Sequence, residues 1–207
     1  MGFGHGGILF PILLKGFRHM RRFVAAVSMA FVAIALHAAP QQAPAPWKAK
    51  VTAAMPLLGH RNWVLVVDSA YPLQSSPGVE TIETNASMVD VLQSVLSTIN
   101  GSIHVRPLIY MDAELPFVPD QDAPGASAYR AQIAKVLHGY TIESVLHDKI
   151  IAEVGETGSR FHVLVLKTNL TIPYTSVFIR LDCKYWGADA ESRMRTKMKT
   201  AQPAAAR

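Results

Sequence analysis

One uninterrupted apolar run constrains the fold of this chain more than any other segment. Residues 63–68 read Trp-Val-Leu-Val-Val-Asp, without the alternation that a half-exposed strand shows. A run of this length is typical of a buried strand. It ends at Asp68, an ionisable group placed where ligands gather in open α/β sheets. The run therefore predicts a core strand with a functional end.

Further strands and helices alternate along the chain. We expect strands at residues 81–84, 105–111, 161–167 and 175–185, and helices at 87–99, 128–137 and 144–154. Pro107 indicates an edge or an early strand position, and Gly155 to Gly158 reads as a turn. Strands that alternate with helices predict a single layered α/β domain.

The segments outside the domain have a different composition. Residues 1–39 combine Arg21 and Arg22 with a short apolar stretch and small residues before Pro40, as in a secretory signal peptide. Translation from Met20 would make the preceding residues an over-extended reading frame, and an uncleaved membrane anchor is the alternative. Residues 40–54 read as a Pro/Ala-rich linker, residues 55–187 as the domain, and residues 188–207 as a basic flexible tail. We expect an exported protein, periplasmic or secreted, that is not stably inserted in the membrane after cleavage.

The positive charge lies at the two ends of the chain. The overall net charge is +5, but residues 1–38 hold four cations and no acid, and residues 191–207 hold five cations and one acid. Residues 39–190 are therefore mildly acidic, which argues against a nucleic-acid partner. The single cysteine, Cys183, excludes an intrachain disulfide and is expected to be a small buried side chain in a strand.

Common catalytic signatures are absent from the sequence. There is no Gly-rich phosphate loop, no Gly-x-Ser-x-Gly elbow and no His-Glu-x-x-His motif, and one cysteine excludes a thiolate zinc site. These absences disfavour nucleotide chemistry, serine hydrolysis and metalloprotease activity.

A small set of acids and histidines remains as candidate site residues. His60 precedes the first strand and suits proton transfer near neutral pH, with a capping role as the alternative. His60 and Asp68 flank one strand, so they share a site only if the chain bends near Gly59 or if neighbouring subunits bring opposite ends together. Asp112 and Glu114 follow the second long strand, where they either bind sugar hydroxyls or lie in a solvated loop or at a helix N-terminus.

Two segments together carry a resemblance to a known family. Leu58-Gly-His60 with Val67-Asp-Ser-Ala-Tyr-Pro72 resembles the Leu-Gly-His … Asp-Ala-x-x-Pro segment of the D-ribose pyranase / L-fucose mutarotase (RbsD/FucU) family. Ile172-Pro-Tyr-Thr-Ser176, followed by an apolar strand, resembles that family's Pro-Tyr-Ala-Asn ending. The segments stand in the family's order at the two ends of the domain.

The resemblance implies a fold, an activity and a set of site residues. The fold would be a three-layer domain with a mixed central sheet flanked by helices. The activity would be interconversion of monosaccharide ring forms or anomers by general acid–base catalysis, without a metal or organic cofactor. His60 would be the proton donor, and Asp68 and His147 would bind substrate. Tyr174, Thr175 and Ser176 would line a site shared between subunits of a homo-oligomer.

Two departures from the family pattern leave alternatives open. Ser176 stands where the family has Asn, which shortens the side chain and removes an amide donor. The predicted export signal is also unusual for a family that serves cytoplasmic sugar metabolism. The leading hypothesis is an exported pyranase or mutarotase for a ribose- or fucose-like sugar. The alternatives are a non-catalytic sugar-binding module of the cell envelope and a structural envelope protein with a vestigial pocket.

Overall fold

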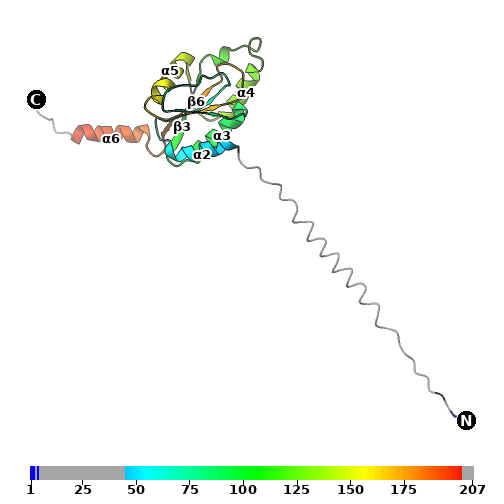
Figure 1. The fold of residues 1–207 in the computed structure, drawn as a ribbon. Coiled ribbons are helices and arrows are strands. Elements are labelled where there is room, and N and C mark those ends of the chain that lie inside the picture. The colour runs from blue at the N-terminus through cyan, green and yellow to red at the C-terminus, as the bar shows by residue number, and fades with distance from the viewer. Residues whose placement is uncertain (3, 5–44, 202–207) are drawn as a thin grey trace, which may run out of the picture. The chain divides into compact units, whose positions relative to one another are not determined.

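A computed structural model describes residues 1, 2, 4 and 45–201. The expected signal peptide and the first part of the expected linker lie almost wholly outside these residues, so both stay predictions. Within the continuous stretch the chain forms a six-stranded mixed sheet with helices on both faces (Figure 1). The strands are β1 (Trp63–Val67), β2 (Val79–Glu83), β3 (Val105–Asp112), β4 (Ile142–Val145), β5 (Val163–Lys167) and β6 (Val177–Cys183). The helices are α2 (Pro46–Ala54), α3 (Met88–Gly101), α4 (Ala126–Val136), α5 (His147–Gly158) and α6 (Ala188–Ala201), with short 3₁₀ turns at Met55–Leu57 and Leu115–Phe117.

The sheet has the order β2-β5-β1-β6-β3-β4, and only β6 runs against the others. The carboxyl ends of the five parallel strands therefore meet at one edge of the sheet, where β6 begins. Every residue of β1 is buried, as the apolar run predicted. Pro107 lies opposite Leu181 of β6, in the half of β3 that β4 does not reach, so its missing N–H costs no ladder bond on that side.

The two faces of the sheet carry different helices. On one face, alternate strand residues such as Val64, Val66 and Ile179 pack with α2, α3 and α4. On the other face, Trp63, Leu65 and Phe178 pack with α5. The layered α/β architecture with a mixed central sheet is thus confirmed. Helix α3 begins where predicted, because the Ser87 hydroxyl accepts a hydrogen bond from the Asp90 N–H.

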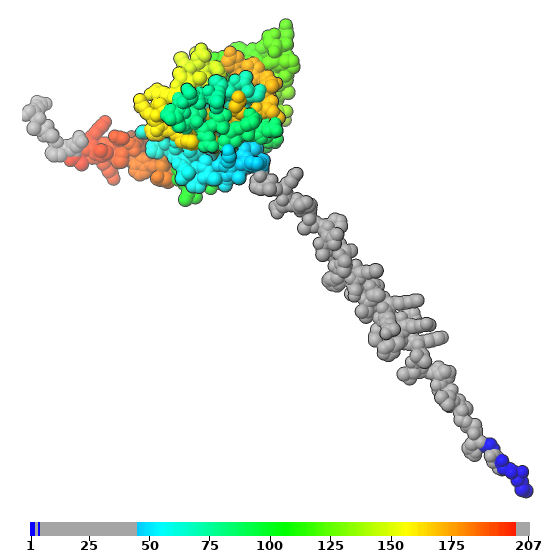
Figure 2. All heavy atoms as spheres, viewed as in Figure 1, coloured from blue at the N-terminus to red at the C-terminus, as the bar shows by residue number. Residues whose placement is uncertain are grey.

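The expected linker at residues 40–54 is wrong in its second half. Residues 46–54 form α2, which begins with Pro46 at its first turn, and Trp47 and Val51 are 5% and 1% exposed within the core. Figure 2 shows the cyan atoms of α2 packed against the green atoms of α3. This helix was not predicted because only two of its side chains enter the core, so the sequence shows no clear apolar spacing among its prolines and alanines.

Two other boundaries also differ from the predictions. The segment expected to be a helix from residue 144 begins as edge strand β4, whose solvent-exposed residues give no apolar pattern. The expected turn at 155–158 is the last turn of α5. Gly158 is needed there for close packing rather than for a turn, since a Cβ on it would lie 2.5 Å from the Val79 side chain.

The expected flexible tail is helical over its described part. Helix α6 buries no side chain, which explains why its sequence shows no core pattern. Its first turns are held by Glu191, which accepts hydrogen bonds from the Trp186 indole and the Arg195 guanidinium. None of the helices among the described residues has both the length and the apolar character needed to span a membrane.

The burial of Trp47 gives a test of where the domain begins. Trp47→Ala should lower the free energy of unfolding by about 3 kcal/mol, since it opens a cavity between α2 and α3. Chemical denaturation measures this change, with the neighbouring exposed Lys48→Ala as control. Equal stability of the two variants would show that α2 is no part of the folded domain.

Candidate functional site

Four adjacent strands place polar side chains at one edge of the sheet. Asp68 follows β1, Tyr174 precedes β6, Asp112 ends β3, and His147 begins α5 directly after β4. The order β1-β6-β3-β4 makes these positions neighbours although they are separated by up to 106 residues in sequence. Strand ends of this kind are where open α/β sheets bind ligands.

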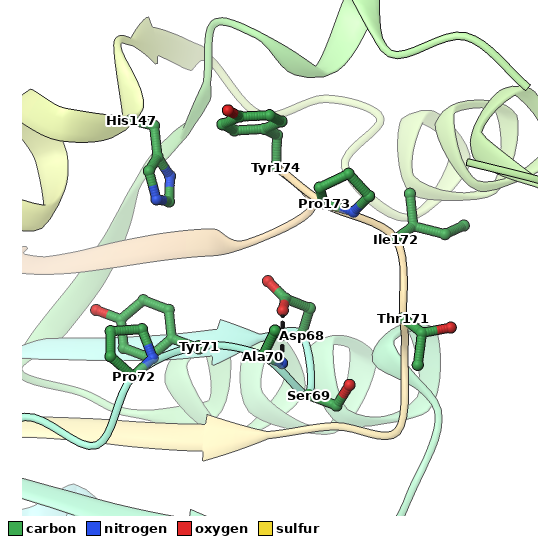
Figure 3. Close-up of a pocket in the computed structure, with 10 residues that line it drawn as sticks. All are labelled: Asp68, Ser69, Ala70, Tyr71, Pro72, His147, Thr171, Ile172, Pro173 and Tyr174. Atoms are coloured by element: carbon green, nitrogen blue, oxygen red, sulfur yellow. Dashed lines mark hydrogen bonds between the residues drawn. The ribbon is translucent and has the colours of Figure 1, made fainter. Parts of the chain in front are cut away.

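A cleft of about 470 Å³ lies at this edge. Asp68, His147 and Tyr174 line it, together with residues of the loops after β1 and before β6. In Figure 3, His147 and Tyr174 lie next to each other on one side of the cleft, and Asp68 lies across from them. The Asp68 carboxylate accepts a hydrogen bond of 2.8 Å from the Ala70 N–H, which fixes its orientation and leaves the second oxygen available to a ligand.

Asp112 lies behind His147 rather than in the cleft. Its side chain is fully buried, and its Oδ1 is 3.0 Å from Nδ1 of His147. With the carboxylate as acceptor, this geometry selects the tautomer in which Nδ1 carries the hydrogen. The His147 side chain itself is 34% exposed. The arrangement is a buried carboxyl that holds an imidazole at the wall of a cleft.

Burial dominates the electrostatics of Asp112. Desolvation raises the pKa of its carboxyl, the hydrogen bond and charge of His147 lower it, and Glu114 and Asp68 raise it further, with a net upward shift. Burial also raises the pKa of the Tyr71 hydroxyl, with Asp112 and Asp68 as smaller causes. Both tyrosine and aspartate therefore hold their protons more firmly than they do in water.

Glu114 holds the backbone of the same histidine. Its two carboxylate oxygens lie 3.0 and 3.1 Å from the His147 N–H, at the first residue of α5. Residue Leu146 offers no side-chain cap, so Glu114 provides the acceptor from a different part of the chain. Of the alternatives for Glu114, the structure places it at a helix N-terminus, and it does not line the cleft.

Only one residue of the segment 174–176, Tyr174, lines the cleft. Tyr174 has a left-handed backbone with φ of 58°, which turns its ring into the cleft in an edge-on contact with His147 at 5.3 Å. Thr175 and Ser176 were expected to line the site, but they are 0% and 1% exposed. Both side chains are buried before β6 begins at Val177, and the Thr175 hydroxyl donates a hydrogen bond of 2.8 Å to the Ile172 carbonyl.

His60 does not reach this cleft within one chain. It lies in the loop before β1, at the opposite end of that strand, and lines a second cavity with Arg61, Arg106 and Trp186. The chain does not bend at Gly59 enough to bring His60 to Asp68. The structure excludes the first of the two routes that the sequence left open, and the second, association between subunits, stays a prediction.

Sequence reasoning missed two parts of the site. Tyr71 lines the cleft. It belongs to the Ser-Ala-Tyr-Pro segment that carries the resemblance, but it was not predicted as a site residue. The pairing of Asp112 with His147 was also missed, since it depends on β4, which was not predicted. Among the described residues no group of three or more His, Cys, Asp or Glu is placed to hold a metal ion.

Comparison with known proteins finds similarity at the level of structure. No protein-family model matches the chain, and no curated protein matches it. The chain is similar to RbsD of Bacillus subtilis complexed with D-ribose (TM-score 0.47, 13% identity, 69% of this chain and 95% of that chain). It is similar to FucU of Bifidobacterium longum (0.44, 14%, 69% and 96%) and to the fucose mutarotase of Streptococcus pneumoniae in complex with L-fucose (0.42, 19%, 70% and 96%). These structures bear the names of the family that the two sequence segments resemble; membership of that family stays a prediction, and the roles of individual residues rest on the geometry described above.

The carbonyl of Thr175 gives a test of how the site segment is held. Tyr129 of α4 donates a hydrogen bond of 2.6 Å to it inside the core. Tyr129→Phe should destabilise the protein by about 1–2 kcal/mol, because it leaves a buried carbonyl without this partner. The control is Tyr140→Phe, whose hydroxyl bonds Asn100 at the surface and should matter less when both variants are unfolded in denaturant.

The raised pKa of Asp112 predicts a pH dependence of stability. A folded-state pKa above the unfolded value means that wild type loses stability as pH rises from the unfolded pKa through the folded one. Asp112→Asn cannot ionise, so its stability relative to wild type should increase over that interval and then level off. Unfolding measured between about pH 4 and pH 8 tests this, with the exposed Glu156→Gln as control. Parallel curves for wild type and Asp112→Asn would contradict it.

Proposed function

We propose that this protein interconverts ring forms or anomers of a monosaccharide at the cleft between β1, β6, β3 and β4. The observation that carries the proposal is the convergence of an acid–base group, His147, with the hydrogen-bonding groups of Asp68 and Tyr174 on one cleft. Ring opening of a hemiacetal requires removal of a proton from the anomeric hydroxyl and delivery of a proton to the ring oxygen. Side chains that exchange protons near neutral pH suffice for both steps.

The polar and apolar groups that line the cleft suit a sugar. Its lining combines carboxylate, imidazole and phenol groups with the apolar faces of Tyr174 and Ile172, and sugars present hydroxyl edges beside apolar C–H faces. The sequence resemblance to the pyranase and mutarotase family points to the same substrate class. Ribose and fucose are the sugars named for two of the similar structures and are the first to test.

We further propose that His60 reaches the cleft from a neighbouring subunit. Within one chain His60 and Asp68 lie beyond opposite ends of β1, so a head-to-tail contact between protomers is the arrangement that joins them. Exposed apolar side chains at both ends of the sheet support such a contact. Leu57 and Ile103 are 85% and 87% exposed at the end near His60, and Leu73 and Phe117 are 80% and 84% exposed at the end near the cleft. The protein would then be a homo-oligomer with sites between subunits.

An exported location is part of the proposal. The apolar stretch after Arg21 and Arg22, followed by small residues before Pro40, supports it. The protein would act on free sugars in the periplasm or outside the cell. It would not handle nucleic acid, since residues 39–190 carry more acidic than basic side chains.

Anomer exchange measured by saturation-transfer NMR tests the activity directly. The wild-type protein should accelerate exchange of ribose, fucose or another aldose, and His60→Ala and His147→Ala should each reduce the rate by about 10²-fold. No exchange on any aldose, or His60→Ala as fast as wild type, would contradict the proposal. Saturable binding in calorimetry without exchange would identify the alternative, a sugar-binding module, which the absence of His60 from the cleft of a single chain favours.

Mixed oligomers test whether two subunits share the site. His60→Ala and His147→Ala protomers, unfolded and refolded together in equal amounts, should recover about a quarter of wild-type activity, since that fraction of interfaces would join two intact halves. Mixtures refolded separately serve as the control. If activity does not rise on co-refolding, His60 and His147 do not meet in one site between two subunits.

A further inference from the structure

Asp112 combines two features that a purely structural aspartate rarely shows. Its side chain has no exposure, yet its Oδ2 has no hydrogen-bond partner among the described residues, while Oδ1 contacts only His147. Burying a carboxyl with half of its hydrogen-bonding capacity unmet is unfavourable. An apolar residue at this position of β3 would serve the fold at least as well. What Asp112 provides is therefore directed at His147.

Three contacts fix the position of His147. Asp112 holds Nδ1, Glu114 accepts from the backbone N–H, and the Tyr174 ring meets the imidazole at 90°. Strand β4 adds a backbone bond of 2.9 Å from the Ala113 N–H to the Val145 carbonyl, which ties the loop of Asp112 and Glu114 to the start of α5. No described residue bonds Nε2, the nitrogen that remains for the cleft. A histidine that only contacts a hydroxyl would not need this degree of constraint.

Ring opening needs two groups that transfer protons. The anomeric O–H loses its proton to a base as the C1–O1 bond becomes a carbonyl, and the C1–ring-oxygen bond breaks as an acid protonates the ring oxygen. Closure reverses these steps on either face, so atoms and charges balance without a further reactant. Both oxygens are bonded to C1, and one proton leaves O1 while another reaches the ring oxygen, so a base at one oxygen and an acid at the other serve the reaction in both directions.

We infer that His147 is the second proton-transfer group of the site and that Asp112 is its positioning residue. This inference rests on the proposed function, in which His60 supplies the first group. Nδ1–H is held by Asp112, so Nε2 alone exchanges the proton, and the carboxyl stabilises the imidazolium that forms. The ionisable groups around His147 are Asp112 and Glu114, which bond it, and Asp68, Tyr71 and Tyr174, which line the same cleft; Asp148 is its neighbour in sequence.

A double-mutant cycle with anomer-exchange kinetics tests the assignment. Asp112→Asn should lower the exchange rate by about tenfold, the order seen when the partner of a functional histidine is lost. His147→Gln should lower it by about 10²-fold. If Asp112 acts through His147, the double variant should be no slower than His147→Gln alone. The exposed Glu156→Gln, on the same helix, should leave the rate unchanged.

The split between turnover and binding separates positioning from structural damage. Asp112→Asn should lower the maximal exchange rate, while the sugar concentration at half-maximal rate stays within about twofold. Additive losses in the double variant, or a raised sugar concentration at half-maximal rate with an unchanged maximal rate, would overturn the inference while wild-type exchange stands. A wild type without exchange on any aldose would overturn the proposed function itself.

Discussion

The pairing of β6 with both β1 and β3 holds this domain together. β1 and β3 run parallel but never touch each other, and the antiparallel β6 forms the ladder on each of its sides. Without it the sheet would separate into the β2-β5-β1 and β3-β4 halves. Residues 177–179 of β6 are fully buried, which is the burial expected of a central strand covered on both faces.

The same strand determines the geometry of the site. Asp68 and Asp112 end strands on either side of β6, so the segment that enters β6 must pass between them. Tyr174 makes this entry with a left-handed turn, and the next two residues are already in the core. Only one side chain of the segment is therefore available to a ligand, whatever residue occupies position 176. Ser176, where the resemblance expects Asn, is buried beneath the surface rather than in the wall of the cleft.

The sequence predicted the strong elements of this fold and missed the weak ones for a common physical reason. β1, β5 and α3 bury many apolar side chains, so the spacing of apolar residues in the sequence predicts these elements. Helix α2 buries only two residues, and β4 and α6 bury none. The sequence of these elements therefore shows little apolar pattern. Asp68, His147 and Tyr174 were predicted because they flank legible elements or match a family segment. The Asp112–His147 contact was not, since it forms across the strand β4 that the pattern did not reveal.

Under the proposed function, the positions of the two histidines relate catalysis to association. His147 is held at the cleft by groups of its own chain, while His60 precedes β1 and lies beyond the opposite end of that strand. A single protomer thus contains a cleft with one histidine, His147, in its wall. If protomers associate head to tail, each cleft gains the second group without any change of fold. Turnover would then depend on assembly, whereas binding would not. The two hypotheses, a sugar isomerase and a non-catalytic sugar-binding module, would then describe the assembled protein and the single protomer.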